Sequence, residues 1–159
     1  MEFLQCVLYV FLLGVASGII GSWLPREWFH PDRPPYRCRP WEDGGKIYLK
    51  LHIRDWKDRV PDMSKISKRL YRKSVDTTPN SANLQRLIAE TCVAEFMHYV
   101  ILLLSLMVLR IWRGKWGAVF YLLCILWNLP CILIQRFNRP RLQKTLKRME
   151  SKKVAEPAE

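Results

Sequence analysis

The sequence predicts an all-α integral membrane protein, with three transmembrane helices and one or two amphipathic helices on the cytosolic membrane surface. Half of the 159 residues are hydrophobic, and they form three blocks instead of being scattered along the chain. Each block approaches the roughly 20 residues that cross a bilayer core as a helix. The blocks cover residues 3–24, 96–112 and 116–134. Basic residues dominate the segments between and after them, and the formal net charge is +12.

The first transmembrane helix is predicted over residues 1–24. No positive charge precedes its apolar run, and the run is longer than the core of a typical signal peptide, so a retained helix is favoured. Gly14 and Gly18 lie four residues apart, with Gly21 nearby. These glycines either let another helix approach closely or reflect ordinary membrane-helix composition.

Residues 25–80 are predicted to form a cytosolic segment that follows the membrane surface. Five of the ten prolines fall between residues 25 and 40, which disfavours regular structure there. Residues 46–54 alternate apolar and polar side chains, as a half-buried strand does. A lone strand would leave open edges at the bilayer, so we predict an interfacial helix instead.

A second amphipathic helix is predicted after Pro61. Met63, Ile66 and Leu70 recur at helical spacing, and lysines and arginines occupy the opposite face. Such a helix suits an anionic membrane surface. Basic residues on a solvated face would give a similar pattern.

The second half of the chain is predicted to form a helical hairpin with a basic tail. One helix covers residues 81–112, enters the membrane and crosses it. A tight turn at residues 113–115 leads into the third transmembrane helix, over residues 116–135. Residues 136–159 form the tail, where Pro140 is expected to stiffen the exit from the membrane.

The distribution of basic residues predicts the orientation in the cell membrane. Of 26 lysines and arginines, 15 lie between residues 25 and 95, 8 follow residue 134, and 3 lie at the hairpin turn. Positive charge is retained on the cytosolic side, so the long segment and the tail are predicted to be cytosolic and the amino terminus outside. This topology brings the start of the second helix and the end of the third to one membrane surface.

Polar residues at the start of the second membrane helix are candidates for acid–base chemistry. Thr91, Glu95 and His98 recur at intervals of four and three, so they share one helical face. A carboxylate that orients a histidine creates a general base, with Glu95, Glu90 or Asp58 as the partner. The alternative is a helix that carries ordinary polar residues at headgroup depth.

A second polar cluster follows the third membrane helix. Arg136 and Arg139, flanked by Gln135 and Asn138, resemble a site for phosphate or carboxylate groups, because guanidinium groups bind such anions bidentately. Basic residues that anchor the helix on the cytosolic side explain the same charges. If both clusters lie at one membrane face, they form a candidate reaction centre.

The remaining chemical motifs are weak or missing from the sequence. Five cysteines show no CxxC spacing, and Glu95-x-x-His98, the spacing of di-iron bundles, has no second copy. The chain has no Gly-rich phosphate loop, no Ser-His-Asp pattern and no nucleic-acid motif. We therefore expect no metal, no cofactor and no nucleic-acid partner, and the membrane accounts for the basic charge.

Several stretches of the chain together form a longer pattern. They are Trp56-Lys57, Glu90-Thr91-x-x-Ala94-Glu95-x-x-His98, Asn128-x-Pro130 and Gln135-Arg136-Phe137-Asn138-Arg139-Pro140-Arg141. This pattern resembles the glycosyl-4,4'-diaponeurosporenoate acyltransferases, small bacterial membrane proteins that complete a C30 carotenoid pigment of the staphyloxanthin type. The similarity extends from about residue 41 to residue 148. Asp58 departs from the family's pattern, which has no acidic residue there, and this disfavours an essential role for it.

The resemblance implies transfer of a fatty acyl chain to the primary hydroxyl of a sugar on a glycosylated carotenoid acid or related glycolipid. The partners would then be an acyl donor, expected to be a thioester, and the glycosylated lipid acceptor. We expect His98, supported by Glu95 or Glu90, to act as the base. The residues expected to bind the donor or acceptor are Arg136, Asn138, Arg139, Gln135, Tyr48, Trp56 and Lys57. A non-catalytic membrane subunit and a lipid-binding component remain alternatives at this stage.

Overall fold

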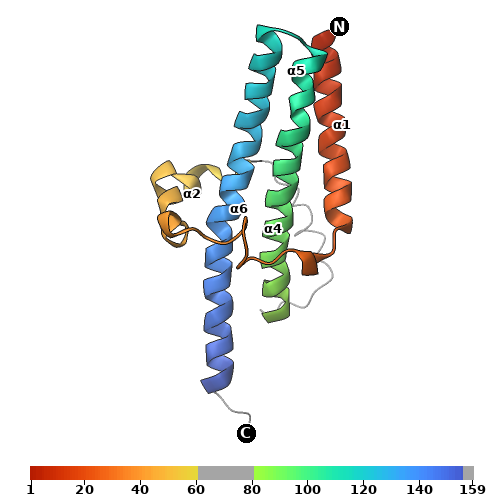
Figure 1. Cartoon of the computed structure of the whole chain (residues 1–159). Coiled ribbons are helices and arrows are strands. Elements are labelled where there is room, and N and C mark those ends of the chain that lie inside the picture. The colour runs from red at the N-terminus through yellow and green to blue at the C-terminus, as the bar shows by residue number, and fades with distance from the viewer. Residues whose placement is uncertain (61–80, 156–159) are drawn as a thin grey trace.

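The computed structural model describes residues 1–60 and 81–155, and every regular element in those residues is a helix. Three helical runs are long and apolar enough to cross a membrane: Glu2–Trp23, Ser81–Ile111 and Lys115–Lys152. They lie side by side with the amino terminus next to the hairpin turn (Figure 1). The predicted all-α membrane fold with three spanning helices is therefore confirmed.

Helix α1 (Glu2–Trp23) packs along the second membrane helix near the end of its apolar run. A Cβ atom on Gly21 would lie 3.1 Å from the side chain of Met97, so glycine permits the close approach of the two helices at this point. At Gly14 and Gly18 a Cβ atom would meet no other heavy atom within 4 Å. Of the three glycines considered from the sequence, only Gly21 serves packing within the described chain.

The second membrane helix comprises α4 (Ser81–Leu104), a short 3-10 turn η3 (Ser105–Met107) and α5 (Val108–Ile111). The chain then reverses at Gly114, whose φ of 93° lies in the left-handed region that favours glycine. This turn delivers the chain directly into the third membrane helix.

Helix α6 (Lys115–Ala155) is longer than the sequence predicts. It continues for 41 residues, through Pro130 and Pro140, and extends beyond the bundle in Figure 1. The sequence predicts a stiffened exit at Pro140 and a tail from residue 136, and this prediction of where the helix ends is wrong. A proline removes one backbone hydrogen bond, but water or neighbouring polar groups at a membrane surface can satisfy the freed carbonyl, so the helix is not forced to end.

Residues 24–60, called the surface segment below, cross α4 and α6 in short helical turns. These are η1 (Arg26–Trp28), η2 (Pro40–Leu51) and α2 (Ile53–Trp56). The choice of helix over strand for residues 46–54 is confirmed, although most of it is 3-10 helix. The second amphipathic helix, predicted after Pro61, lies outside the described residues.

A kink in η2 brings this segment against α6. Gly44 and Gly45 have φ values of 61° and 84°. A Cβ atom on Gly45 would lie 3.3 Å from the carbonyl oxygen of Phe137, so the close contact with α6 requires a residue without a side chain. A small core, separate from the packing of the membrane helices, covers this contact. It consists of Tyr48, Ile53, Ile134 and Phe137.

Candidate active site

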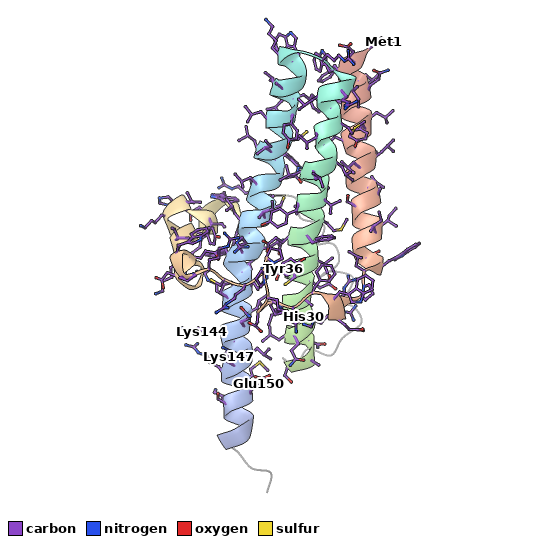
Figure 2. All side chains as sticks on the ribbon, viewed as in Figure 1. Met1, His30, Tyr36, Lys144, Lys147 and Glu150 are labelled. Carbon is purple, nitrogen blue, oxygen red and sulfur yellow. The ribbon has the colours of Figure 1, made fainter. Side chains whose placement is uncertain are left out.

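The polar residues of the chain gather where α4 and α6 face each other near the end of the apolar helices. Arg136 lies 21 residues after the start of α6 at Lys115, or about 31 Å along the helix axis. That rise is close to the thickness of a bilayer's hydrocarbon core, about 30 Å. Tyr36, labelled in Figure 2, marks the level at which the surface segment crosses the two helices. We therefore expect the site to lie near the membrane boundary.

Glu95 is the centre of a buried ionic network. Its carboxylate is 0% exposed and accepts hydrogen bonds from Arg136 Nη1 at 2.7 Å and Arg139 Nη2 at 2.5 Å. The hydroxyl of Tyr99, one turn further along α4, also donates to it at 2.8 Å. The two polar clusters predicted from sequence are thus in direct contact.

Arg136 links Glu95 to the surface segment. Its Nε and Nη2 groups donate to the two carboxylate oxygens of Glu42 at 2.6 and 2.8 Å, in a bidentate pair. The backbone carbonyls of Pro35 and Arg37 accept further bonds at 3.1 and 3.4 Å. With the bond to Glu95, these contacts engage all five N–H groups of the guanidinium.

Arg139 binds α4 and the surface segment in the same way. Its Nε donates to Thr91 Oγ1 at 2.9 Å, and its Nη2 donates to the Thr91 carbonyl at 3.0 Å. The carbonyl of Tyr36 accepts from Nη1 at 2.6 Å, and the Tyr36 ring lies 5.5 Å from the guanidinium carbon. Since Nη2 also donates to Glu95, four of the five N–H groups are engaged. The side chain is 2% exposed.

The charges of the network balance, with two guanidinium groups against the carboxylates of Glu42 and Glu95. Burial by itself raises the pKa of Glu42. Hydrogen bonds from Arg136, the Arg39 backbone and Tyr48 outweigh burial and lower that pKa to about 2. Burial and the bond to Glu42 raise the pKa of the Tyr48 hydroxyl. Glu42 is therefore ionised and Tyr48 neutral at physiological pH.

This network changes the interpretation of the arginine-rich motif. Arg136 and Arg139 were expected to hold substrate anions, but nearly all of their N–H groups bind groups of the same chain. Their evident contribution is to fasten residues 35–42 onto α4 and α6. Gln135 is buried, while Asn138 is half-buried and takes no part in the network among the described residues.

The aromatic residues expected to seat a sugar or polyene lie beside the network, not at an open surface. Tyr48 is buried, and its hydroxyl donates to Glu42. Trp56 is half-buried in the core of η2, and its Nε1 donates to the Leu51 carbonyl at 2.9 Å. Lys57 forms a salt bridge with Asp58 at 3.0 Å. None of the three side chains contacts His98 through a hydrogen bond in the described structure.

None of the three carboxylates considered as partners of His98 is hydrogen-bonded to it, and Asp58 pairs with Lys57. Glu95 is engaged by the two arginines, and Glu90 accepts two bonds from Arg26, at 2.9 and 3.0 Å. The Arg26–Glu90 pair instead joins the end of α1 to α4. Glu95 and His98 are three residues apart on α4, so their side chains face different parts of α6. Glu95 faces the two arginines, and His98 contacts a residue about one helical turn closer to the hairpin.

That residue is Asn128 of α6. His98 Nδ1 lies 2.8 Å from Asn128 Oδ1, and Asn128 Nδ2 donates to the Cys124 carbonyl at 2.9 Å. A backbone carbonyl only accepts, so the amide nitrogen must face Cys124 and the amide oxygen must face His98. Nδ1 therefore carries the proton, and the lone pair of the neutral imidazole is on Nε2. This is the tautomer that a general base requires.

Nε2 of His98 remains open to a ligand. It forms no hydrogen bond within residues 1–60 and 81–155, and the side chain is half-buried. In the same residues Ser105 Oγ is the one side-chain nitrogen or oxygen that is both fully buried and without a partner. Nε2 is consequently not sealed inside the protein. Those residues contain no group of three or more histidines, cysteines and acids that could hold a metal ion.

Sequence reasoning missed two residues that organise the site. Asn128 enters the sequence analysis only as part of the Asn128-x-Pro130 stretch, yet an amide in a membrane span is costly unless it has polar partners. Glu42 was not considered, although it precedes the Gly44–Gly45 kink that turns the segment toward α6. For Asn128 the sequence does contain a signal: one amide in the third apolar run and one histidine in the second, each among apolar residues. For Glu42 no local signal exists, because its partner is 94 residues away.

The fold and the site together define a small integral membrane protein with a closed ionic network and a histidine–asparagine pair near the membrane boundary. A model of the glycosyl-4,4'-diaponeurosporenoate acyltransferase family matches residues 25–148, and the chain belongs to this family. The resemblance seen in the sequence is thereby confirmed. The protein is a membrane acyltransferase.

Relatives from Staphylococcus aureus agree with this assignment. The glycosyl-4,4'-diaponeurosporenoate acyltransferase of strain RF122 is 27% identical over 144 residues, which cover 89% of this chain and 86% of the relative. The enzyme of the same name from strain Newman is 26% identical over 149 residues, covering 92% and 89%. No solved structure matches the chain.

Proposed function

We propose that the protein transfers a fatty acyl group to a sugar hydroxyl of a glycosylated carotenoid acid or closely related glycolipid. The relatives' name supports a glycosylated carotenoid acid as the acceptor. The site's position supports it as well, since a polar headgroup on an apolar chain lies at the membrane boundary. The observation that carries the chemistry is the His98–Asn128 pair, which presents a basic nitrogen without any competing partner in the described structure.

In the proposed reaction His98 Nε2 accepts the proton of the sugar hydroxyl as the oxygen attacks the carbonyl carbon of an acyl thioester. A C–O bond forms, the C–S bond breaks, and the imidazolium returns the proton to the departing sulfur. Asn128 keeps the proton on Nδ1 throughout and holds the ring in position. A positioned general base of this kind accelerates a reaction by about 10²–10⁴-fold.

The ionic network supports this chemistry indirectly. It fixes α4 against α6 one turn from His98, through bonds that Glu95 makes to both arginines. It also holds residues 35–42 across the two helices. The network thus keeps the histidine and asparagine in register while leaving substrate recognition to other groups.

We further propose that the protein resides in the cell membrane with the amino terminus outside and the carboxy terminus in the cytosol. The excess of lysine and arginine in residues 25–95 and after residue 134 supports this orientation. It places the site where thioester donors are made. Reporter fusions at each terminus test it, and an enzymatically active cytosolic reporter at the amino terminus would contradict it.

Substitution of His98 tests the proposed function directly. In a strain that supplies the glycosylated carotenoid, His98→Gln should lower the amount of acyl ester in extracted lipids by at least about a hundredfold. The unacylated precursor should accumulate, and the amount of protein in the membrane should be unchanged. Lipid mass spectrometry measures the product and its acyl mass.

The chain provides a matched control, because it contains three histidines. His30 is exposed and has no side-chain partner among the described residues, so His30→Gln repeats the substitution away from the site. It should leave ester formation unchanged. Full activity of His98→Gln would show that His98 is not the general base. Absence of any acyl ester in the wild-type strain would contradict the proposed reaction.

A further inference from the structure

The end of α6 carries basic side chains that the ionic network does not use. Lys144, Arg148 and Lys152 recur every four residues, so they share one face of the helix, and Lys147 lies beside them. All four are exposed, and Figure 2 shows Lys144 and Lys147 on the lower part of α6, level with the first turns of α4. None of them forms a salt bridge within the residues that the structure describes.

The helix carries these charges away from the membrane. Because α6 is continuous, Lys144 and Lys152 lie 8 and 16 residues beyond Arg136, or about 12 and 24 Å further along the axis. Electrostatic attraction to anionic lipids falls off within a Debye length, about 8 Å at physiological ionic strength. Headgroups extend about 5–8 Å beyond the hydrocarbon core, so Lys144 reaches them. Arg148 and Lys152 lie more than a Debye length past the headgroups, and a partner for them must approach from the aqueous side.

The arginines next to the site have few donors left for a substrate. The phosphates of a thioester donor, or of a carrier's prosthetic arm, bind best to free guanidinium or lysine groups. Arg136 and Arg139 have nine of their ten N–H groups engaged inside the protein. Recognition of the donor on α6 is thus left to basic residues further along the helix.

We propose that the stripe formed by Lys144, Lys147, Arg148 and Lys152 docks an acidic soluble protein that carries the fatty acyl chain as a thioester. This inference rests on the proposed acyl transfer and names the class of donor. Positive charges at one-turn intervals match carboxylates spaced by four residues on a partner helix. Asn128 lies on the same continuous helix, so a docked carrier is held on the element that positions His98.

Charge reversal tests the docking. The full-length protein, in nanodiscs of neutral phosphatidylcholine, is titrated with an acidic acyl carrier protein loaded with a fatty acyl chain. Lys144→Glu combined with Arg148→Glu should raise the Kd by at least about tenfold at about 0.1 M salt, because like charges would then face each other. With the carrier as donor, KM should rise by a similar factor while kcat is retained.

A matched control uses another pair of exposed basic residues four apart. Lys50 and Arg54 lie on the surface segment, and the double reversal Lys50→Glu and Arg54→Glu should leave the Kd unchanged. Equal losses in both variants would contradict a specific stripe. His98→Gln should bind the loaded carrier as the wild type does, which separates docking from chemistry.

Two further outcomes overturn the docking proposal while leaving the acyl transfer intact. The first is efficient transfer from acyl-coenzyme A by a wild-type protein that shows no affinity for the carrier. The second is stripe-dependent binding to vesicles of anionic lipid, with no binding to the carrier, which would assign the basic face to the membrane. Failure of every thioester donor, with carrier binding preserved, would instead reject the proposed reaction.

Discussion

The ionic network and the His98–Asn128 pair are neighbours on the same two helices, yet they differ in how their polar atoms are used. Almost all N–H groups of Arg136 and Arg139 are hydrogen-bonded within the protein. Their acceptors are Glu42, Glu95, Thr91 and backbone carbonyls. His98 uses one ring nitrogen and leaves the other open. The more conspicuous cluster in the sequence therefore holds distant segments together, whereas the open nitrogen beside it is available for chemistry.

The largest effect is expected from breaking the network at Arg139. Arg139→Met leaves the buried Glu95 short of one partner and should lower the free energy of unfolding by about 3–5 kcal/mol. Chemical unfolding in detergent micelles measures the loss, with the exposed Arg54→Met as a control. If the Arg139→Met protein is folded and stable but inactive, Arg139 binds substrate and does not mainly stabilise the fold.

The next largest effect is a dependence of stability on pH that comes from Glu42. Its pKa in the folded protein is about 2, below the ordinary value of 4.5. The stabilisation is therefore fully present above about pH 4.5 and is lost as the pH falls toward 2. It amounts to a free energy on the order of 3 kcal/mol.

The unfolding midpoints of the wild type and Glu42→Gln, followed from about pH 7 to about pH 3, reveal this component. The variant should be less stable at neutral pH, and the difference should shrink as the solution is acidified. A gap that stays constant across the range would show that ionised Glu42 is not what holds the surface segment on α6.

At the histidine pair we expect a kinetic effect with little loss of stability. Asn128→Leu removes the acceptor that fixes the tautomer of His98, and kcat should fall by about 10- to 100-fold with KM nearly unchanged. Asn128→Asp keeps an acceptor facing Nδ1 and should retain more activity than the leucine variant. Equal losses in the two variants would indicate that Asn128 serves packing only.

The smallest effect is expected at Glu90. Its salt bridge with Arg26 is partly exposed, with the side chains 24% and 29% accessible, and such pairs contribute about 0–1 kcal/mol to stability. Glu90→Gln should therefore leave ester formation within about twofold of the wild type. If Glu90→Gln lowers ester formation as much as His98→Gln does, Glu90 supports the base after all.

The sequence alone determined the membrane architecture. Three apolar runs of sufficient length, separated by basic segments and by Arg113-Gly114-Lys115, specify three spanning helices and their connections, because burial in lipid depends on local composition and length. It also predicts Glu95, His98 and Arg136 as polar residues near a membrane boundary, because polar groups in a membrane span are costly without partners.

Which polar group meets which was decided only by the tertiary structure. Glu42 joins Arg136 across 94 residues, and Asn128 joins His98 across 30. The packing of η2 on α6 selects the first pair and the packing of α4 on α6 selects the second, and no local pattern encodes either. The same applies to the length of α6, because the satisfaction of the carbonyl freed by Pro140 depends on its surroundings in three dimensions. Local sequence fixes what an isolated segment prefers, whereas hydrogen-bond partners are set by how distant segments pack.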